Sequence, residues 1–200
     1  LARRLATLPE AERAAASALL SREDEVVGRF KRLLSRKVAA PRIRTHGDYH
    51  LGRILFTGRD FAVLDFEGEP SRSLSERRLK RSPLRDVAAM LRSFQYAAFA
   101  RLFEEASAGV VSAELLPELE RWALYWERWV SATFLRAYFD CAGDGAREAS
   151  FLPSSAEERA LLLDAFLLEK AMQELGYELN NRPAWVRIPL QGIRQILSAG

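Results

Sequence analysis

The segment that most constrains the fold of this chain covers residues 46–65. It contains the glycine-bearing stretch HGDYHLG, followed by two short apolar runs, ILF and FAVL, which the turn-forming residues TGRD separate. Such runs predict a β-hairpin that carries Asp65 back towards Asp48. An aspartate in a tight loop can accept the proton of an attacking hydroxyl, and one at a strand end can hold the magnesium that bridges transferring phosphates. The pattern therefore predicts Asp48 as a catalytic residue and Asp65 as a metal ligand.

The two histidines of this stretch, His46 and His50, are four residues apart, a spacing that would suit a zinc site on a helix. Gly47 and Asp48 lie between them and indicate a loop instead. We therefore expect His46 and His50 to hold the loop through hydrogen bonds. Asp86, further along the chain, is expected to cap or anchor a helix and to take no part in catalysis.

The sequence on both sides of this segment predicts helices. Two are expected within the first 36 residues, and Ser82 followed by Pro83 marks the start of another that runs to about Glu105. A capping-box pattern starts the last long helix, which is expected at about residues 156–180.

A further helix, starting near Pro117, carries large apolar side chains at helical spacing. They are Leu119, Trp122, Trp126 and Trp129. Tryptophans at three- and four-residue intervals are typical of the face that a helix turns towards the core. We therefore predict that this stripe is buried and does not form a ligand site.

The helix at about 156–180 combines an apolar and a polar stripe. The apolar residues repeat at steps of four and three and predict a core face. They are Leu161, Ala165, Leu168, Met172, Leu175 and Leu179. Beside them runs a polar and aromatic stripe at steps of four, three and four residues, formed by Lys170, Glu174, Tyr177 and Asn181. A purely solvated helix face would more often lack the tyrosine.

Composition narrows the class of protein. With 200 residues, 48% of them hydrophobic, the chain is of a size for one domain with a buried core. The single cysteine, Cys141, cannot form an internal disulfide. The sequence shows no signal-like start and no apolar run of the roughly 18 residues that a membrane span needs. We therefore expect a cytoplasmic protein that does not insert into a membrane.

Basic residues gather between Arg72 and Arg85, although the net charge is only +3. A nucleic-acid-binding surface normally combines a basic patch with a recognisable binding motif, and no such motif accompanies this run. We expect no nucleic-acid partner and interpret the run as a solvated loop face. The sequence does not separate this interpretation from a role of these arginines in binding an anionic ligand such as phosphate.

One block of the sequence resembles the catalytic region of a known family. The stretch HGDYH with the later Asp65 resembles the catalytic loop of aminoglycoside phosphotransferase-like kinases. The longer run, through DFEGEP at 65–70 to SPLRDVA at 82–88 and MLRSF at 90–94, resembles the maltokinases in particular.

A second block, far from the first, resembles the C-terminal signature of the maltokinases. It consists of LEKA at 168–171, YELNNRP at 177–183, Trp185 and IPL at 188–190. The resemblance covers the chain from about Arg42 onward. Two distant blocks that point to the same family would rarely arise by chance.

The resemblance implies a mainly α fold with a short β-hairpin, the C-lobe of a protein-kinase-like fold, over residues 1–200. Within it, a catalytic loop at 46–53, a metal-binding segment at 65–70 and a substrate helix at about 156–180 are implied. Such kinases bind ATP between this lobe and an N-terminal lobe with a phosphate-covering loop and a lysine. We expect this N-terminal ATP lobe to be absent from the chain, because no such motif precedes Arg42.

The implied reaction is the ATP-dependent phosphorylation of maltose, or a related small sugar, at its anomeric hydroxyl to give maltose 1-phosphate. The implied cofactors are ATP and Mg²⁺, with Asp48 deprotonating the hydroxyl and Asp65 holding the metal. The residues that would contact the sugar are Glu67, Lys170, Glu174, Tyr177 and Asn181. A solvent-facing turn explains Glu67 equally well.

Two residues depart from the family pattern. Relatives carry Gln or Asn, whose carbonyl oxygen ligates a magnesium ion, where this chain has Arg53. A guanidinium has no acceptor atom and carries a fixed positive charge, so it cannot replace that ligand. Gln173 stands where the substrate helix commonly carries a tyrosine, which leaves the identity of the sugar open.

Two other classes of function stay open. A non-catalytic sugar-binding module would keep the sugar-facing stripe without turnover, and Arg53 together with the missing lobe favours it. An interaction subunit would pair with a separate ATP lobe or with a neighbouring trehalose synthase. It would need an apolar docking face above the hairpin.

Overall fold

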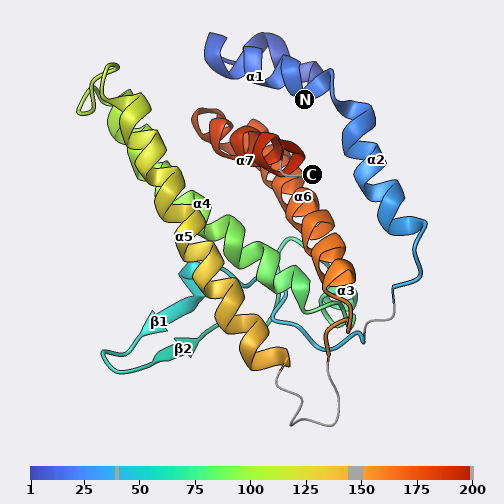
Figure 1. Cartoon of the computed structure of the whole chain (residues 1–200). Coiled ribbons are helices and arrows are strands. Elements are labelled where there is room, and N and C mark those ends of the chain that lie inside the picture. The colour runs from blue at the N-terminus through green and yellow to red at the C-terminus, as the bar shows by residue number, and fades with distance from the viewer. Residues whose placement is uncertain (39–40, 144–150, 199–200) are drawn as a thin grey trace.

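The computed structural model of the chain describes residues 1–38, 41–143 and 151–198. Its elements, with η for 3-10 helices, are η1 (Ala2–Thr7), α1 (Glu10–Leu20), α2 (Glu23–Leu34), η2 (Leu51–Arg53), β1 (Ile54–Phe56), β2 (Phe61–Val63), α3 (Leu74–Arg77), α4 (Leu84–Ser107), α5 (Leu116–Gly143), α6 (Ala156–Asn181), η3 (Pro183–Trp185) and α7 (Arg187–Ser198). Helices dominate, and the two strands form a small hairpin at one end (Figure 1). The predicted fold, mainly α with a short β-hairpin, is confirmed. Within the described residues, no helix is long and apolar enough to cross a membrane.

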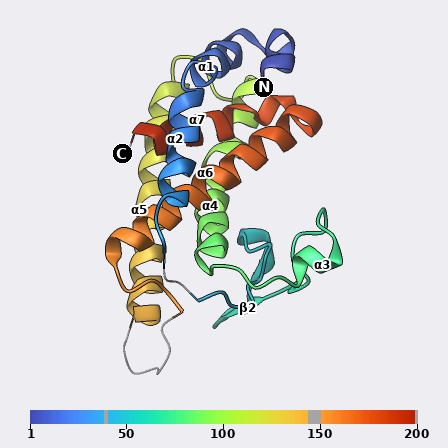
Figure 2. The same ribbon diagram turned by 90° about the vertical axis from the view of Figure 1, so that its right-hand side faces the viewer.

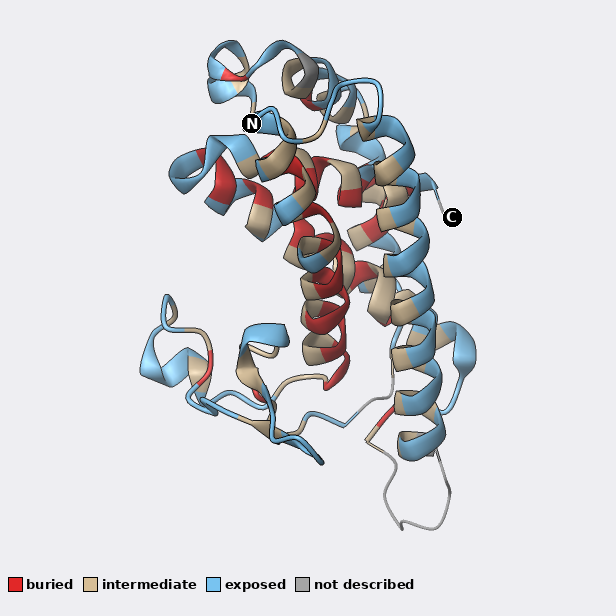
Figure 3. Ribbon diagram, turned by 90° about the vertical axis from the view of Figure 1, so that its left-hand side faces the viewer, coloured by how far each residue is buried: buried red, intermediate tan, exposed pale blue. Residues whose placement is uncertain are grey.

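The central helix of the bundle is α4. It packs against α5 and α6, and Figure 3 shows that buried residues concentrate along it. Leu84, Val87 and Met90 bury its first turns in one apolar cluster. On the outside, α7 packs against α6, while α1 contacts α7 and α2 contacts α6. Because its beginning is buried, α4 gives the loop before it a fixed support.

The last long helix, α6, begins as its capping pattern predicts, because the side chain of Ser155 accepts a hydrogen bond from the backbone N–H of Glu158. Most of the predicted apolar stripe is buried, namely Ala165, Leu168, Leu175 and Leu179. Leu161 is half-buried and Met172 is exposed, so the stripe leaves the core at these two positions.

The prediction for α5 is wrong in one respect. Trp122, Trp126 and Trp129 are exposed, although their spacing indicated a core face. The side of α5 that packs into the bundle instead carries Val130, Phe134, Leu135 and Tyr138. The helix therefore has large apolar residues on two sides, and periodicity alone could not tell which one its neighbours cover.

The hairpin has the predicted strands and turn. β1 and β2 are antiparallel, with Ile54 opposite Val63 and Phe56 opposite Phe61. The backbone N–H of Thr57 donates to the carbonyl oxygen of Asp60 at 2.8 Å and closes the turn. Figure 2 shows the hairpin and the segment with α3 below the helices, with α3 standing apart from them on one side. This arrangement brings the loops of the candidate site to the bundle.

Candidate active site

The loop that bears Asp48 is fixed to the start of α4 by Asp86. One carboxylate oxygen of Asp86 accepts from the backbone N–H of His46 at 2.7 Å, and the other accepts from that of Gly47 at 3.0 Å. Burial raises the pKa of Asp86, and these two backbone donors oppose the rise. Asp86 therefore anchors the loop to the helix, as predicted, and it also lines the cleft described below.

Glycine is needed where this loop meets the segment after Asp65. Gly47 has a φ of +80°, and a Cβ placed on it would lie 3.3 Å from the Cα of Gly68. Gly68 has a positive φ as well, at +78°. The two backbones thus approach more closely than side chains would allow.

The two histidines make different contacts within the loop. The buried His46 donates from Nε2 to the carbonyl oxygen of Leu64 at 2.7 Å, and its Nδ1 accepts from the backbone N–H of Asp48 at 3.3 Å. His50 accepts at Nδ1 from the backbone N–H of Gly52 at 3.1 Å, and its Nε2 lies 3.6 Å from an Asp48 oxygen. Burial lowers the pKa of His50, which favours the neutral ring. His46 thus links the loop of Asp48 to the end of β2.

Asp48 and Asp65 are brought together through Arg53. The Nη2 atom of Arg53 donates to Asp48 Oδ2 at 2.9 Å, and its Nη1 atom donates to Asp65 Oδ2. The Asp48 side chain is 13% exposed, whereas that of Asp65 is 47% exposed. Asp65 also has a φ of +59°, an unusual backbone conformation for a non-glycine residue, which turns the chain back after β2.

This arrangement does not fit a magnesium ion shared by the two aspartates. Magnesium is usually held by one or two carboxylates together with substrate phosphates. Here the guanidinium of Arg53 bonds to both carboxylates and holds a positive charge between them. Over residues 1–38, 41–143 and 151–198, no three His, Cys, Asp or Glu side chains are grouped to hold a metal.

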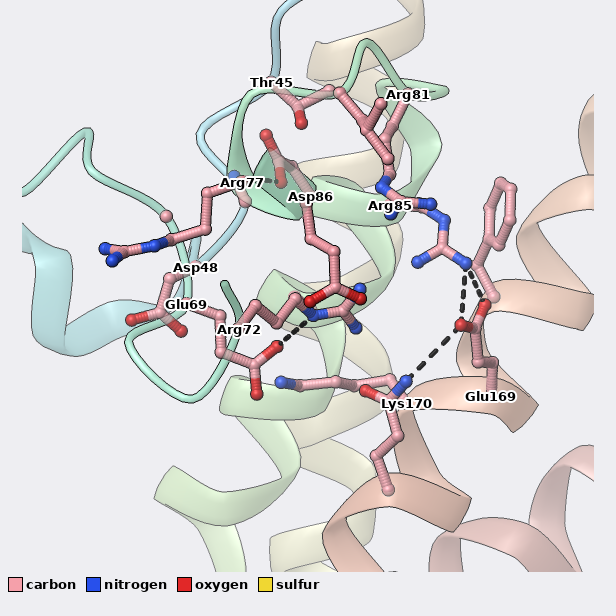
Figure 4. A pocket seen from close by; sticks show the side chains of 17 residues that line it. Thr45, Asp48, Glu69, Arg72, Arg77, Arg81, Arg85, Asp86, Glu169 and Lys170 are labelled. Carbon is pink, nitrogen blue, oxygen red and sulfur yellow. Dashed lines mark hydrogen bonds and ion pairs between the residues drawn. The ribbon is translucent and has the colours of Figure 1, made fainter. Parts of the chain in front are cut away.

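A cleft lies beside Asp48, between the loops, the beginning of α4 and the middle of α6. Figure 4 shows Asp48, Glu69 and Lys170 around it. Two ion pairs form part of its lining: Arg72 Nε donates to Glu69 at 2.9 Å, and Arg85 Nη2 donates to Glu169 at 2.6 Å. The pKa of Glu69 is lowered, because its bonds to Arg72 and its other polar neighbours outweigh the opposing effect of burial. The cleft is thus lined by donors and acceptors in alternation.

Several of these residues were not predicted as site residues. They are Glu69, Arg72, Arg85 and Glu169. The basic run offered a partial signal, since Arg72, Arg77, Arg81 and Arg85 all line the cleft. Its interpretation as a solvated loop face therefore fails for these four arginines, whereas Arg78 and Lys80 are exposed.

The predicted sugar-binding residues are distributed over a longer surface than the cleft. Lys170 lines the cleft, and Glu67 lies exposed at its margin with its backbone oxygen 3.4 Å from Arg77 Nη1. Glu174 accepts from Arg92 Nε at 2.8 Å and is largely buried in that pair.

The remaining two, Tyr177 and Asn181, lie near the C-terminal end of α6. Tyr177 is exposed, with the Arg182 guanidinium 5.3 Å from its ring centre. Asn181 is exposed and donates from Nδ2 to the carbonyl oxygen of Tyr177. At about 1.5 Å of rise per residue, Asn181 lies roughly 16 Å along the helix from Lys170.

Next to Tyr177, the C-terminal block builds a buried polar network around Glu178, which is 1% exposed. Arg182 donates to Glu178 from Nε at 2.9 Å and from Nη2 at 2.7 Å, and the Tyr96 hydroxyl donates to it at 3.0 Å. The same Arg182 lies 4.2 Å over the ring of Trp185. This part of the block joins α6 to α4 and η3.

Comparisons with known proteins show that this chain is similar to phosphotransferase kinases. The family model named Phosphotransferase enzyme family (APH) matches residues 1–68, a range that includes Asp48, Arg53 and Asp65. Among curated proteins, the chain is similar to the glucosamine kinase of Mycolicibacterium smegmatis. The two are 26% identical over 161 residues, which is 80% of this chain and 36% of that protein.

Solved structures give the same fold. The structure of glucosamine kinase in complex with glucosamine, ADP and inorganic phosphate has a TM-score of 0.74 and 23% identity, over 98% of this chain and 44% of that chain. Crystal form A of glucosamine kinase has a TM-score of 0.72, also at 23% identity. The chain therefore has the fold of part of such a kinase and spans less than half the length of the relatives that it matches.

Proposed function

We propose that this chain forms the catalytic and sugar-binding part of an ATP-dependent sugar kinase. The observation that carries the proposal is the position of Asp48, which is held on a loop anchored by Asp86 and faces a cleft lined by hydrogen-bonding side chains. The relation to the phosphotransferase family supports a transfer of phosphate over other reactions of a carboxylate.

In the proposed reaction, a sugar hydroxyl lies beside Asp48, and its proton passes to the Asp48 carboxylate. The sugar oxygen attacks the terminal phosphorus of ATP; the new O–P bond forms as the bond to ADP breaks. Glu69 and Lys170 hydrogen-bond the other hydroxyls and hold the ring in place. Most of the rate acceleration then comes from positioning.

Two sugars are candidates for this cleft. The relative named glucosamine kinase supports glucosamine, whereas the sequence blocks that resemble maltokinases support maltose. The proposal takes glucosamine first, because its protonated amine would have a partner in Glu69 or Glu169, which line the cleft. Phosphorylation of maltose to maltose 1-phosphate remains the alternative. A trehalose synthase partner is supported by the resemblance alone.

Arg53 limits when this chemistry can occur. An Asp48 oxygen that accepts hydrogen bonds from Arg53 is not free to accept the substrate proton. A magnesium ion at Asp65 belongs to the proposal only for a state in which Arg53 has released that carboxylate. The same contacts favour the second candidate, a sugar-binding module without turnover.

The ATP-binding lobe is proposed to dock on the hairpin. Leu55, Phe56 and Phe61 are each more than half exposed there, although they are large and apolar. Exposed apolar side chains gathered at one place mark an interaction surface. The lobe would come from a longer form of this protein or from a separate chain.

Titration calorimetry of the 200-residue chain with glucosamine, maltose and glucose tests the sugar proposal. We expect binding of one sugar that Glu69→Gln weakens, with no turnover when ATP and magnesium are added, because the ATP-binding lobe supplies half of the phosphate clamp. Turnover above that of an Asp48→Asn control would contradict the second expectation. If none of the three sugars binds, the proposal that this chain binds a sugar is wrong.

A further inference from the structure

The outer side of α5 carries a compact set of exposed aromatic side chains, here called the aromatic face. They are Trp122 at 62%, Tyr125 at 60%, Trp126 at 45% and Trp129 at 67% exposure. Single exposed apolar residues are common on proteins, but a contiguous group of this size marks an interaction site. In Figure 3, α5 runs along one edge of the molecule with its outer side mostly exposed.

The aromatic face is separate from the core of the bundle. The opposite side of α5 already packs inward through Val130, Phe134 and Tyr138. The exposed rings contact one another, with centroids 6.1 Å apart for Trp122 and Tyr125 and 6.3 Å apart for Tyr125 and Trp129. Despite these contacts, Trp122, Tyr125 and Trp129 stay more than half exposed.

The order of the aromatic residues is symmetric along the helix. Two residues separate Trp122 from the adjacent pair Tyr125 and Trp126, and two residues separate that pair from Trp129. The spacing is therefore the same in both directions along the helix. Two copies of α5 that pack antiparallel about a two-fold axis between Tyr125 and Trp126 would therefore place Trp122 opposite Trp129 of the second copy. Tyr125 would lie opposite Trp126 of the second copy. A two-fold interface needs this kind of self-complementary surface.

Charges at the two ends of the aromatic face complement each other in the same arrangement. Glu118 and Arg136 are exposed and continue the face at its two ends. The antiparallel packing would bring Glu118 of one copy within about one helical turn of Arg136 of the other. Arg136 is 86% exposed, and its ion pair with Asp140 is long, at 3.9 Å, so its side chain can reach a new partner.

The area is sufficient for a specific contact. Aromatic side chains present roughly 150–250 Å² each, so the aromatic face exposes on the order of 500 Å² per copy. Two copies would bury on the order of 1,000 Å² from these rings alone, about the lower limit of specific interfaces. Arg121 and Arg128, exposed on the flank, would form part of a polar rim.

We propose that the aromatic face of α5 is a homodimer interface, in which two copies pair antiparallel through Trp122, Tyr125, Trp126 and Trp129. This surface is distinct from the sugar cleft and from the hairpin. Trp and Tyr are the residues that most often dominate the energy of an interface. The proposal does not depend on which sugar the protein binds.

Sedimentation velocity across a dilution series tests the proposal. We expect the wild-type chain to reach the mass of a dimer, and Trp126→Glu to raise the dimer dissociation constant by about 30-fold or more, the size of a hot-spot loss. Val110→Glu is the matched control, because Val110 is an apolar residue exposed at 73% that lies in the loop before α5 and outside the aromatic face. A folded wild-type chain that remains monomeric at every concentration would overturn the proposal, and so would a dimer that Trp126→Glu and Val110→Glu affect equally.

A charge-reversal cycle tests the antiparallel pairing. Glu118→Arg and Arg136→Glu should each weaken the dimer, and the double variant should restore much of the loss. Circular dichroism on each variant keeps folding separate from association. Loss of dimer in the double variant equal to the sum of the single losses would refute the antiparallel arrangement.

Discussion

The two ends of the polar stripe of α6 lie next to similar charged residues in opposite settings. At the cleft end, Glu169 pairs with Arg85 while both side chains stay about a quarter to a third exposed. At the C-terminal end, Glu178 is only 1% exposed. It pairs with Arg182 and also accepts a hydrogen bond from the Tyr96 hydroxyl. Charge at the first end is accessible to a ligand, whereas charge at the second end is already used to join helices.

The predicted polar stripe crosses from one setting to the other. Lys170 belongs to the cleft, while Tyr177 and Asn181 lie beside the buried network. A stripe that is continuous on a helical wheel therefore has two different surroundings along the helix axis. Variants at the two ends should consequently affect different measurements.

The largest expected effect is on stability at the C-terminal end. Glu178→Gln should lower the free energy of unfolding by about 1–3 kcal/mol, because a buried amide cannot accept the hydrogen bonds that the carboxylate accepts from both Arg182 and the Tyr96 hydroxyl. Glu169→Gln, in the exposed pair with Arg85, should cost less than about 1 kcal/mol. Urea denaturation of the two variants measures the contrast. Equal losses would show that the two ends do not differ as described.

The next effect concerns Arg53, beside the cleft. Arg53→Gln should increase the affinity for a divalent cation roughly tenfold, because it removes a positive charge from between Asp48 and Asp65 and adds an amide oxygen. Manganese binding, followed by paramagnetic broadening, measures this without any turnover. Arg59→Gln, on the exposed hairpin turn, is the control for loss of charge.

A second role for Arg53 would reverse the kinetic outcome. If Arg53 neutralises the transferring phosphate, then Arg53→Gln in a form that has its ATP lobe should lower the rate or leave it unchanged. If Arg53 blocks the site, the same substitution should raise the rate and lower the magnesium concentration needed for it. The two possible roles of Arg53 therefore predict opposite changes of the phosphorylation rate in a single assay.

A smaller effect is expected for Lys170. Lys170→Met keeps the apolar stem but removes the ammonium, and it should weaken sugar binding about tenfold through loss of a charged hydrogen bond. Stability should change little, because the side chain lines an open cleft. Calorimetric titration of the Lys170→Met variant with the sugar measures the loss of affinity. Unchanged affinity would remove Lys170 from the sugar site.

The smallest effect is expected for Tyr177. Tyr177→Ala should leave sugar affinity within about twofold, because roughly 10 Å of helix separates it from Lys170. It should cost only about 0.5–1 kcal/mol of stability through the lost contact with Arg182. A thermal melt and a sugar titration on this variant decide the matter. A marked loss of sugar affinity with an unchanged melt would instead extend the binding site to the end of α6.

Local sequence signals were sufficient for much of the fold. The capping pattern at Ser155, the proline at the start of α4 and the turn residues of the hairpin each act within a few residues, so their effects are visible in sequence. The same holds for the loop around Asp48, whose glycine and histidines set a recognisable local geometry. These elements predicted helices around one hairpin, and the family resemblance added the expectation of a kinase-like C-lobe.

Features that depend on distant partners were not accessible in this way. The tryptophans of α5 could be assigned to the core or to the surface only once the neighbours of that helix were known. Sequence showed that Arg53 departs from the family, but the bonds to both aspartates arise only when the hairpin folds back. Likewise, the hydrogen bond between Tyr96 and Glu178 joins residues on two helices far apart in the chain.

The close approach of Gly47 to Gly68 has a mechanical consequence. The two backbones are in contact at this point, with no side chain between them. The position of the loop of Asp48 is therefore coupled to that of the segment after Asp65. A ligand that pushes one of them towards the other would therefore move both. A methyl group at Gly47 would lie 3.3 Å from the Cα of Gly68, so it would force the two segments apart and change the separation of the two carboxylates.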